Sequence, residues 1–215
     1  MLFTDANVDH LGGLAVLRQA GAHAFELYSS ATVRALATDQ PAFATFTRPP
    51  HRWSALASGD VVDLGRGISA RVVALDGLTP GFAGRQALPG AVVGYLVSDG
   101  ATAGSVFFAP VFSGITATLL QAAAEADVAF FDGSFWSDDE LQGFGVEKAA
   151  RALGHAPVGG TNGSLAALAA LPRKGRRLYA HVNNTNPLLD PASAPARAMA
   201  DYGFELARDG LDLQV

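Results

Sequence analysis

Cysteine is absent from this 215-residue chain, and its absence restricts the chemistry that the chain can perform. It excludes disulfides, thiolate nucleophiles and cysteine-ligated zinc or iron–sulfur centres within these residues. A bound metal must therefore take its ligands from His, Asp, Glu or Asn. Long apolar runs are also lacking, since stretches such as residues 128–131 are far too short to span a bilayer and Asp5 interrupts a signal-peptide start. We expect a soluble, cytoplasmic protein with no membrane partner.

Common cofactor and hydrolase motifs are missing as well. The sequence has no P-loop, no G-x-G-x-x-G fingerprint and no G-x-S-x-G elbow, so neither nucleotide cofactors nor serine-hydrolase chemistry is expected. The formal net charge of -5 argues against a nucleic-acid partner, because proteins of that class usually carry a clear basic footprint.

What is present is a globular composition with alternating strand and helix patterns. With 49% apolar and 16% charged residues, the chain can bury the core of a single domain over residues 1–215. Strands are predicted at 25–28, 61–64, 71–75, 91–97, 105–109, 128–131 and 178–182, with two more at 202–207 and 211–215. Helices are predicted at 10–21, around 33–36, at 115–126 and at 164–171. This order predicts an α/β protein with mixed sheets.

Two of the five histidines stand at predicted strand ends. His10 follows Asp9 in the loop after the first short strand, and His181 ends the strand that begins at Leu178. Two imidazoles and one carboxylate are the ligands of the facial triad of iron(II) oxygenases. The same three groups could instead hold a catalytic zinc ion with a water. A loop histidine that only caps a helix is a commoner outcome, and spacing alone leaves these alternatives open.

Other polar residues also follow strands or stand in loops. Asp132 comes directly after a buried strand, where open sheets tend to place site residues, although a helix cap is the plainer interpretation. His155 follows Gly154 and precedes Pro157, a composition typical of a loop. A buried pair of an aspartate and a histidine could transfer protons at neutral pH. Asn183, Asn184 and Asn186 could hydrogen-bond a substrate, yet ordinary turn chemistry explains them about as well.

Taken together, these segments resemble the coenzyme PQQ synthesis protein B family, a branch of the metallo-β-lactamase-like fold. The resemblance covers most of the chain. Its motifs are TDANVDH at 4–10, LPG at 88–90, FAP at 108–110, FDGSFWSDDE at 131–140, GH at 154–155 and HVNNTNP at 181–187. The resemblance implies an αββα sandwich.

In the superfamily motif H-x-H-x-D-H, Asp5 and Asn7 stand at the positions of the first two histidines, while Asp9 and His10 are retained. The resemblance therefore implies a degraded first metal site and a second site made by Asp9, His10 and His181. Asp76 falls roughly where the superfamily's middle histidine would stand, and the resemblance therefore adds it as a fourth predicted metal ligand. One divalent metal is expected, with iron(II) favoured and zinc possible.

The implied function is a step in making pyrroloquinoline quinone (PQQ), by iron- and dioxygen-dependent hydroxylation of the tyrosine ring of a Glu-Tyr-derived precursor. In this hypothesis Asp132 and His155 relay protons or orient the phenol, and the three asparagines hold substrate carboxylates. The partner is a small-molecule or short-peptide precursor, and the oligomeric state is left open. A zinc-dependent hydrolase of the same fold and a carrier for PQQ or its precursor are the alternatives.

The chain departs from the family at its start. Members of the family begin upstream with strands that carry a glycine-rich turn and a cysteine cluster for a structural zinc, and none of these is in the sequence. We therefore expect a sandwich that is incomplete at its N-terminus, with an unpaired sheet edge and poor solubility or activity.

Overall fold

A computed structural model describes residues 1–17, 23–172 and 174–215 of the chain. Its strands are β1 (Glu26–Ser30), β2 (Arg52–Leu56), β3 (Val61–Gly65), β4 (Ile68–Leu75), β5 (Val92–Asp99), β6 (Ser105–Ala109), β7 (Val128–Asp132), β8 (Arg176–Ala180) and β9 (Glu205–Leu206). Its helices are α1 (Val8–Leu17), α2 (Ala31–Thr38), α3 (Ala117–Glu125), α4 (Ala150–Leu153), α5 (Ser164–Ala169) and α6 (Ala194–Asp201). Short 3-10 turns lie at Ala44–Thr47, Gly81–Ala83, Glu140–Phe144 and Pro187–Leu189.

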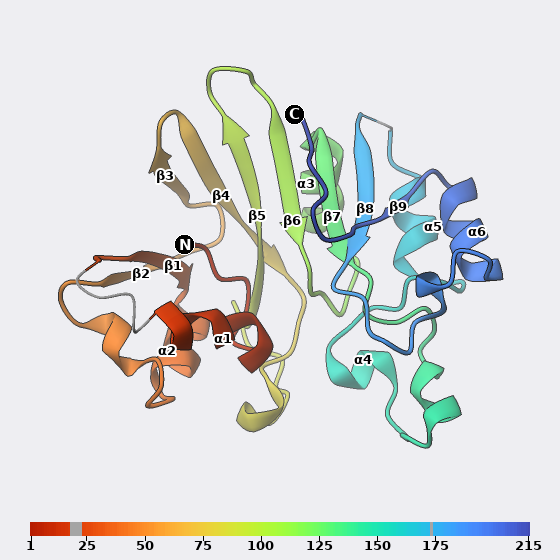
Figure 1. Ribbon diagram of the computed structural model, residues 1–215, viewed down its shortest axis with the longest axis horizontal. Helices are drawn as coiled ribbons and strands as arrows, with labels where there is room; N and C mark the ends of the chain where they lie inside the picture. The colour runs from red at the N-terminus through yellow and green to blue at the C-terminus, as the bar shows by residue number, and fades with distance from the viewer. Residues whose placement is uncertain (18–22, 173) are drawn as a thin grey trace.

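The strands form two sheets (Figure 1). The larger one has the order β3-β4-β5-β6-β7-β8-β9, antiparallel from β3 to β6 and parallel from β6 to β9. The smaller one is the parallel pair β1 and β2, to which Leu2 is added by a parallel bridge to Tyr28. Because β6, β7 and β8 run in the same direction, the loops after them meet at one edge of the sheet.

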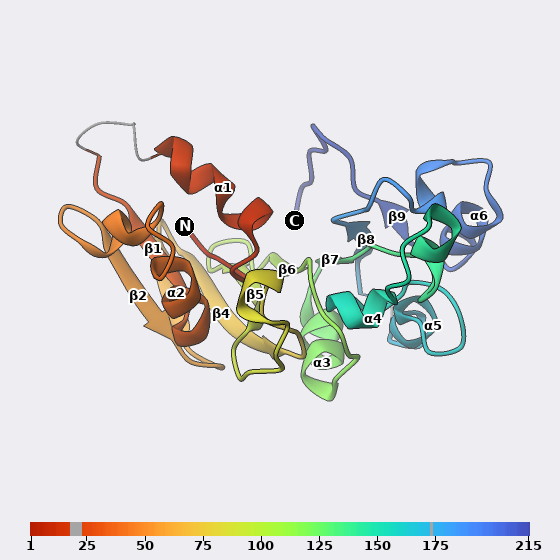
Figure 2. The same cartoon turned by 90° about the horizontal axis from the view of Figure 1, so that it is seen from below.

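Helices lie on both sides of the larger sheet. Figure 2 shows α3 and α5 on one side and α1 on the other. Strand β4 shows why both faces are covered: Val73 and Leu75 join the core with α3, whereas Val72 packs on the opposite face with Tyr95. Successive side chains of a strand point to opposite faces, so the buried residues Val72, Val73 and Leu75 cover both faces of the sheet at the end of β4.

Two helices begin with the expected local chemistry. The Ser30 hydroxyl accepts a hydrogen bond from the backbone N–H of Val33 at the start of α2. The Thr116 hydroxyl does the same for Leu119 at the start of α3. Each cap satisfies one of the backbone donors that a helix leaves free at its N-terminus.

The predicted strands and helices are confirmed in type apart from the last strand, and β2 was not predicted. The predicted strand at 211–215 is wrong, because these residues form no ladder, and β9 contributes only two residues beside β8. The predicted helix end at Gly21 lies outside the described residues. The mixed α/β class is confirmed by the two sheets and their covering helices.

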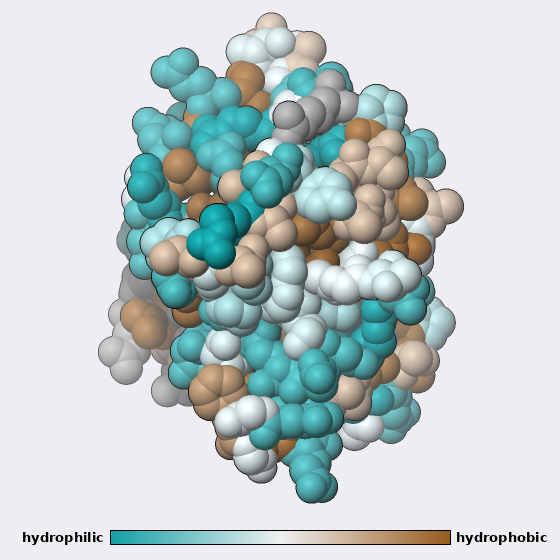
Figure 3. Space-filling view, turned by 90° about the vertical axis from the view of Figure 1, so that its right-hand side faces the viewer, coloured by the Kyte–Doolittle hydropathy of each residue, from teal (hydrophilic) through white to brown (hydrophobic). Residues whose placement is uncertain are grey.

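The surface is varied in polarity. Figure 3, which looks onto the end of the molecule that carries α5 and α6, shows polar residues over much of the lower half and a group of apolar residues in the upper half. Across the described ranges, none of the helices combines the length and the apolar character needed to cross a bilayer.

Phe131 tests the packing that supports the sheet edge. Its side chain is fully buried in β7, and its ring lies near those of Phe107, Tyr179 and Phe204. We expect Phe131→Ala to lower the free energy of unfolding by about 3–5 kcal/mol, because it removes buried apolar surface and leaves a cavity. Phe144→Ala is the matched control, since that side chain is 64% exposed. Urea unfolding measures both, and equal losses would contradict this packing.

Candidate metal centre

The N-terminal part of the centre is placed by a short extended segment. The N–H of Phe3 donates to the carbonyl of Tyr28 at 2.9 Å, and the N–H of Val93 donates to the carbonyl of Thr4 at 2.8 Å. These bonds hold the segment between β1 and β5 and fix the residues that follow. Helix α1 then begins at Val8, so Asp9 and His10 stand in its first turn at the edge of the larger sheet.

Behind His10 lies a buried carboxylate. Nδ1 of His10 is 2.7 Å from Oδ2 of Asp5, which is fully buried. Asp5 also accepts hydrogen bonds from the hydroxyl of Thr4 and from the backbone and side-chain N–H groups of Asn7. This partner fixes the ring of His10 and leaves its Nε2 atom directed elsewhere.

The pKa values of this pair move apart. Burial opposes ionisation of Asp5, but the hydrogen bond and charge of His10 outweigh it and lower the pKa of that carboxyl. Burial likewise disfavours the charged imidazole of His10, yet the hydrogen bond and charge of Asp5 raise its pKa. Both shifts favour a pair in which Asp5 is ionised and a proton lies on the Nδ1 side of His10.

His181 follows β8 in an unusual backbone conformation. Its φ of 55° lies in the left-handed region, where residues other than glycine are uncommon. The turn is held by the N–H of Gly133, which donates to the carbonyl of Ala180 at 2.7 Å, and by the N–H of Asn183, which donates to the carbonyl of Ser134. This conformation directs the imidazole back towards the loop after β7.

Behind His181 lies a second buried network. Nδ1 of His181 is 2.8 Å from the hydroxyl of Ser134, which donates to Oδ1 of Asp132 at 2.6 Å. The other oxygen of Asp132 is 2.7 Å from Nδ1 of His155 and also accepts the backbone N–H of Phe112. The ring of His155 stacks on that of His181, with centroids 5.5 Å apart. The predicted Asp132–His155 pair is therefore present and lies directly beneath His181.

The ionisation of this network follows from its contacts. Burial opposes ionisation of Asp132, but the charge and hydrogen bond of His155 outweigh it and lower the pKa of that carboxyl to about 2. For His155, burial disfavours the charged form, but the charge and hydrogen bond of Asp132 raise its pKa. The network thus keeps a carboxylate in the interior and a proton on the imidazole beside it.

The two histidines meet at their outer nitrogen atoms. Nε2 of His10 lies 2.8 Å from Nε2 of His181, and the carboxylate of Asp9 lies 3.7 Å from the first and 3.9 Å from the second. Two ligands on one ion with bonds of about 2.0–2.2 Å are about 2.9 Å apart in octahedral and about 3.4 Å apart in tetrahedral geometry. The observed separations bracket these values, so this donor set fits one divalent ion with small adjustments, and Asp9 is 74% exposed and free to adjust.

Asp132, His155 and His181 form a second group with ligand atoms close to one another. In this group the Nδ1 atoms of both histidines are already hydrogen-bonded within the protein. We therefore regard it as the support of the first group. Within the described residues these two groups are the only clusters of this kind.

The remaining predicted site residues lie at different places. Asp76 belongs to neither group and stands at the end of β4, where the N–H of Ser113 donates to its backbone carbonyl. Asn183 lines a cavity beside His181, and Asn184 is exposed. Asn186 is buried, and its amide is used within the chain: it donates to the carbonyl of Gly133 and accepts the N–H of Leu188.

Two cavities open on either side of His181. One of about 340 Å³ is polar and is lined by Asp9, Ser134, His155 and Asn183 among others. The other, of about 350 Å³, is mainly apolar, with Phe3, Phe108 and Pro110 in its wall and both His10 and His181 at one end. His181 therefore borders both a polar and an apolar space, and His10 borders the apolar one.

Sequence reasoning missed two residues that position the ligands. Ser134 joins Asp132 to His181, and Asp5 orients His10. Asp5 could have been found, because it is a carboxylate five residues before a candidate ligand at a strand end. Ser134 gave no such signal, since its hydroxyl reaches His181 only through the left-handed turn.

Asp132→Asn tests the buried network. We expect a loss of about 3–5 kcal/mol in unfolding free energy at neutral pH, because the amide nitrogen replaces one carboxylate oxygen and meets a group that already donates, and the charge that pairs with His155 is lost. The folded pKa of Asp132 is about 2 against an ordinary 3.8, so its stabilisation is present above about pH 4 and is lost as the pH falls towards 2. The variant should lack this part of the acid dependence.

The matched control is Asp209→Asn, an exposed carboxyl for which we expect a change below about 0.5 kcal/mol. Urea unfolding between pH 2 and 7 measures all three proteins. A variant as stable as the parent chain, with the same acid dependence, would show that the network is not a stabilising one.

Comparison with known proteins identifies relatives of this chain. The model of the beta-lactamase superfamily domain matches residues 1–182. The coenzyme PQQ synthesis protein B of Rhizobium meliloti (strain 1021) is 34% identical, with all of this chain and 71% of the relative aligned. The protein of the same name from Pseudomonas protegens is 30% identical, with 100% of this chain and 73% of the relative covered.

A solved structure agrees with the fold over the whole chain. The crystal structure of Zn²⁺-bound PqqB from Methylobacterium extorquens superposes with a TM-score of 0.91 at 27% identity, and covers 100% of this chain and 72% of that one. Sequence and structure therefore lead to one assignment. The chain belongs to the coenzyme PQQ synthesis protein B family of the beta-lactamase superfamily.

Proposed function

We propose that this protein acts in the biosynthesis of pyrroloquinoline quinone, as a metal- and dioxygen-dependent enzyme that hydroxylates the tyrosine ring of a Glu-Tyr-derived precursor. Family membership supports the pathway, since the relatives are named for PQQ synthesis. The observation that carries the chemistry is the convergence of Nε2 of His10, Nε2 of His181 and the carboxylate of Asp9. Two imidazoles and one carboxylate on one face of an ion are the arrangement of non-heme iron(II) oxygenases.

Asp9, His10 and His181 would hold the ion, and iron(II) bound there would supply the activation of dioxygen. Asp5 and Ser134 keep the two rings in place, because each occupies the Nδ1 atom and leaves Nε2 for the metal. Asp76 stands outside this set, so the proposal gives it no part in the centre.

His155 is the proposed proton carrier. Its Nδ1 atom faces Asp132, and the raised pKa means that the ring holds a proton more readily than an ordinary histidine. Nε2 is then the atom left to exchange a proton with a ligand in the polar cavity that His155 lines. Asp132 orients this ring and stays ionised.

The two cavities suit a precursor with an aromatic part and a polar part. The apolar cavity with Phe108 and Pro110 would take the phenol ring and bring it to the two histidines. The polar cavity would take a carboxylate, with His155 and Asn183 as the groups that contact it. Asn184 could join them from the rim, whereas the amide of Asn186 already bonds the protein.

A zinc-dependent hydrolase is the second candidate, because the related PqqB structure is described as Zn²⁺-bound. Zinc at the same three ligands would supply an activated water in place of dioxygen chemistry. Metal analysis, followed by oxygen uptake of the iron-loaded and the zinc-loaded protein with the Glu-Tyr-derived precursor, separates the two. Uptake with iron alone supports the oxygenase, whereas precursor binding without turnover under either metal would indicate a carrier.

Removal of a ligand tests the centre itself. We expect one bound iron(II) per chain, and we expect His181→Ala and Asp9→Asn to lose the ion, because two ligands hold it much more weakly than three. His23→Ala and Asp209→Asn are matched controls, since both side chains are exposed. Metal content after gel filtration is the measurement. Full metal occupancy in His181→Ala would place the ion elsewhere.

Ser134→Ala tests the support of His181. The hydroxyl no longer holds Nδ1, so we expect metal affinity to fall by about 10- to 100-fold, the usual effect of removing such a partner. Ser137→Ala is the matched control, because that hydroxyl donates to Asp139 on the surface. Competition with a chromophoric chelator measures both, and unchanged affinity in Ser134→Ala would remove the serine from the centre.

A further inference from the structure

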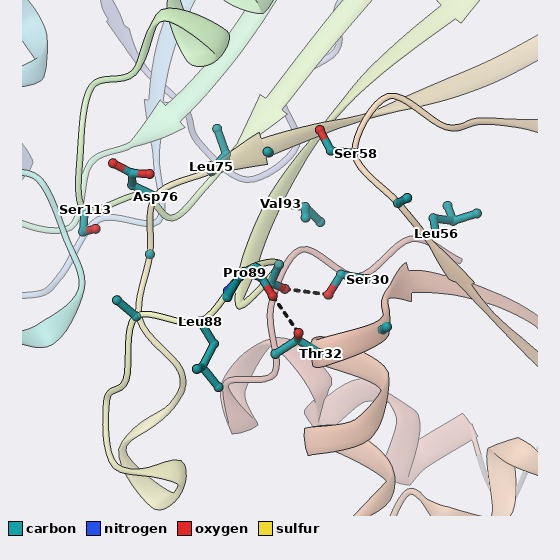
Figure 4. A pocket seen from close by; sticks show the side chains of 16 residues that line it. Ser30, Thr32, Leu56, Ser58, Leu75, Asp76, Leu88, Pro89, Val93 and Ser113 are labelled. Atoms are coloured by element: carbon teal, nitrogen blue, oxygen red, sulfur yellow. Dashed lines mark hydrogen bonds between the residues drawn. The ribbon is translucent and has the colours of Figure 1, made fainter.

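A larger cavity lies away from the candidate metal centre (Figure 4). Its volume is about 730 Å³, within the range of small-molecule sites. Its wall comes from the start of α2, the end of β2 and the turn after it, the end of β4, the start of β5, and the loops before β5 and after β6. It shares no lining residue with the two cavities at His181.

The wall is held in place by hydrogen bonds of its own. The hydroxyl of Ser30 donates to the carbonyl of Gly90 at 2.5 Å, and the hydroxyl of Thr32 donates to the carbonyl of Pro89 at 2.7 Å. These bonds, drawn in Figure 4, fasten the loop before β5 to the start of α2. A site that is already formed loses little ordering entropy when a ligand binds.

The lining combines apolar walls with a single charge. Leu56, Leu88 and Val93 supply the apolar part, and Figure 4 shows them around the space. Among the described residues of the lining Asp76 alone is charged, and it lies beside Ser113 at one end. Among the residues that the structure describes, the Asp76 carboxylate takes part in no hydrogen bond or ion pair.

We propose that this cavity is a binding site for a small organic amine, with its ammonium group against Asp76 and its aromatic or aliphatic body against the leucines. An exposed carboxylate without a cation of its own selects a positive ligand, and the apolar wall rewards burial of a hydrocarbon body. Ser113 lies at the same end and can accept a further hydrogen bond from the ammonium group.

The cavity is connected to the metal centre through the loop after β6, but it shares no lining residue with the cavities there. The loop after β6 contacts both places: the N–H of Phe112 donates to Asp132, and the N–H of Ser113 donates to the carbonyl of Asp76. The proposal rests on the cavity and its charge, so it stands or fails independently of the oxygenase chemistry.

Three probes of one shape and different charge test the proposal: benzylamine, benzyl alcohol and benzoate. We expect benzylamine to shift backbone amide signals of the full chain at residues around Asp76, Leu88 and Ser113 in nitrogen–proton NMR spectra. Benzyl alcohol lacks the positive charge and should bind about 5- to 10-fold more weakly, a modest factor because water partly screens the Asp76 carboxylate. Benzoate should bind more weakly still, because Asp76 repels its negative charge. Equal affinity for the three probes would overturn the proposal.

Two variants separate the charge from the wall. Asp76→Asn should remove the preference for benzylamine and leave the binding of benzyl alcohol unchanged, while Asp209→Asn, the matched exposed control, changes neither. Leu88→Ala should weaken both probes, and it removes a side chain that is 43% exposed, so the fold tolerates it. Unchanged benzylamine affinity in Asp76→Asn, or no signal shift up to millimolar concentration, would contradict an amine site.

Discussion

The buried carboxylate of Asp132 is the interaction on which the edge of the sheet depends. It ends β7 and binds groups from the loops after β6, β7 and α4, namely the N–H of Phe112, the hydroxyl of Ser134 and the imidazole of His155. An ion removed from water to this degree is costly unless every lone pair is used. The donors around Asp132 meet that requirement, and in doing so they bring three separate loops into one arrangement.

A similar arrangement is repeated on the other side of the centre. Asp5 lies behind His10 as Asp132 lies behind His181, directly in the first case and through Ser134 in the second. The two imidazoles stand 171 positions apart in the chain, yet each has an anion behind it, and their Nε2 atoms face each other in front. Such pairing fixes the tautomer and increases the basicity of the outer nitrogen, which is what a metal ligand requires. The two buried carboxylates thus set the orientation and the basicity of the histidines at the edge of the sheet.

Much of this arrangement could be predicted from the sequence, because it follows from where strands end. Asp132 ends β7 and His181 follows β8, and these strands are adjacent and parallel, so the two residues lie close together. Asp76 also follows a strand, but β5 separates β4 from β6, and the order of strands in a sheet is not written in local patterns. Strand pairing also decides the outcome at 211–215, where the sequence has a strand-like pattern but the residues pair with no neighbouring strand. Ser134 was beyond prediction because its contact depends on a backbone torsion at another residue.

That torsion has a consequence for the way the sequence can vary. With a φ of 55°, His181 holds a conformation that costs a side-chain-bearing residue about 1 kcal/mol or more and that glycine adopts freely. The backbone conformation alone therefore favours glycine at this position, whereas the imidazole supplies the nitrogen that faces Nε2 of His10. The backbone conformation and the metal centre therefore favour different residues at position 181. Selection for thermal stability alone can favour glycine there, and the substitution would remove one ligand of the centre.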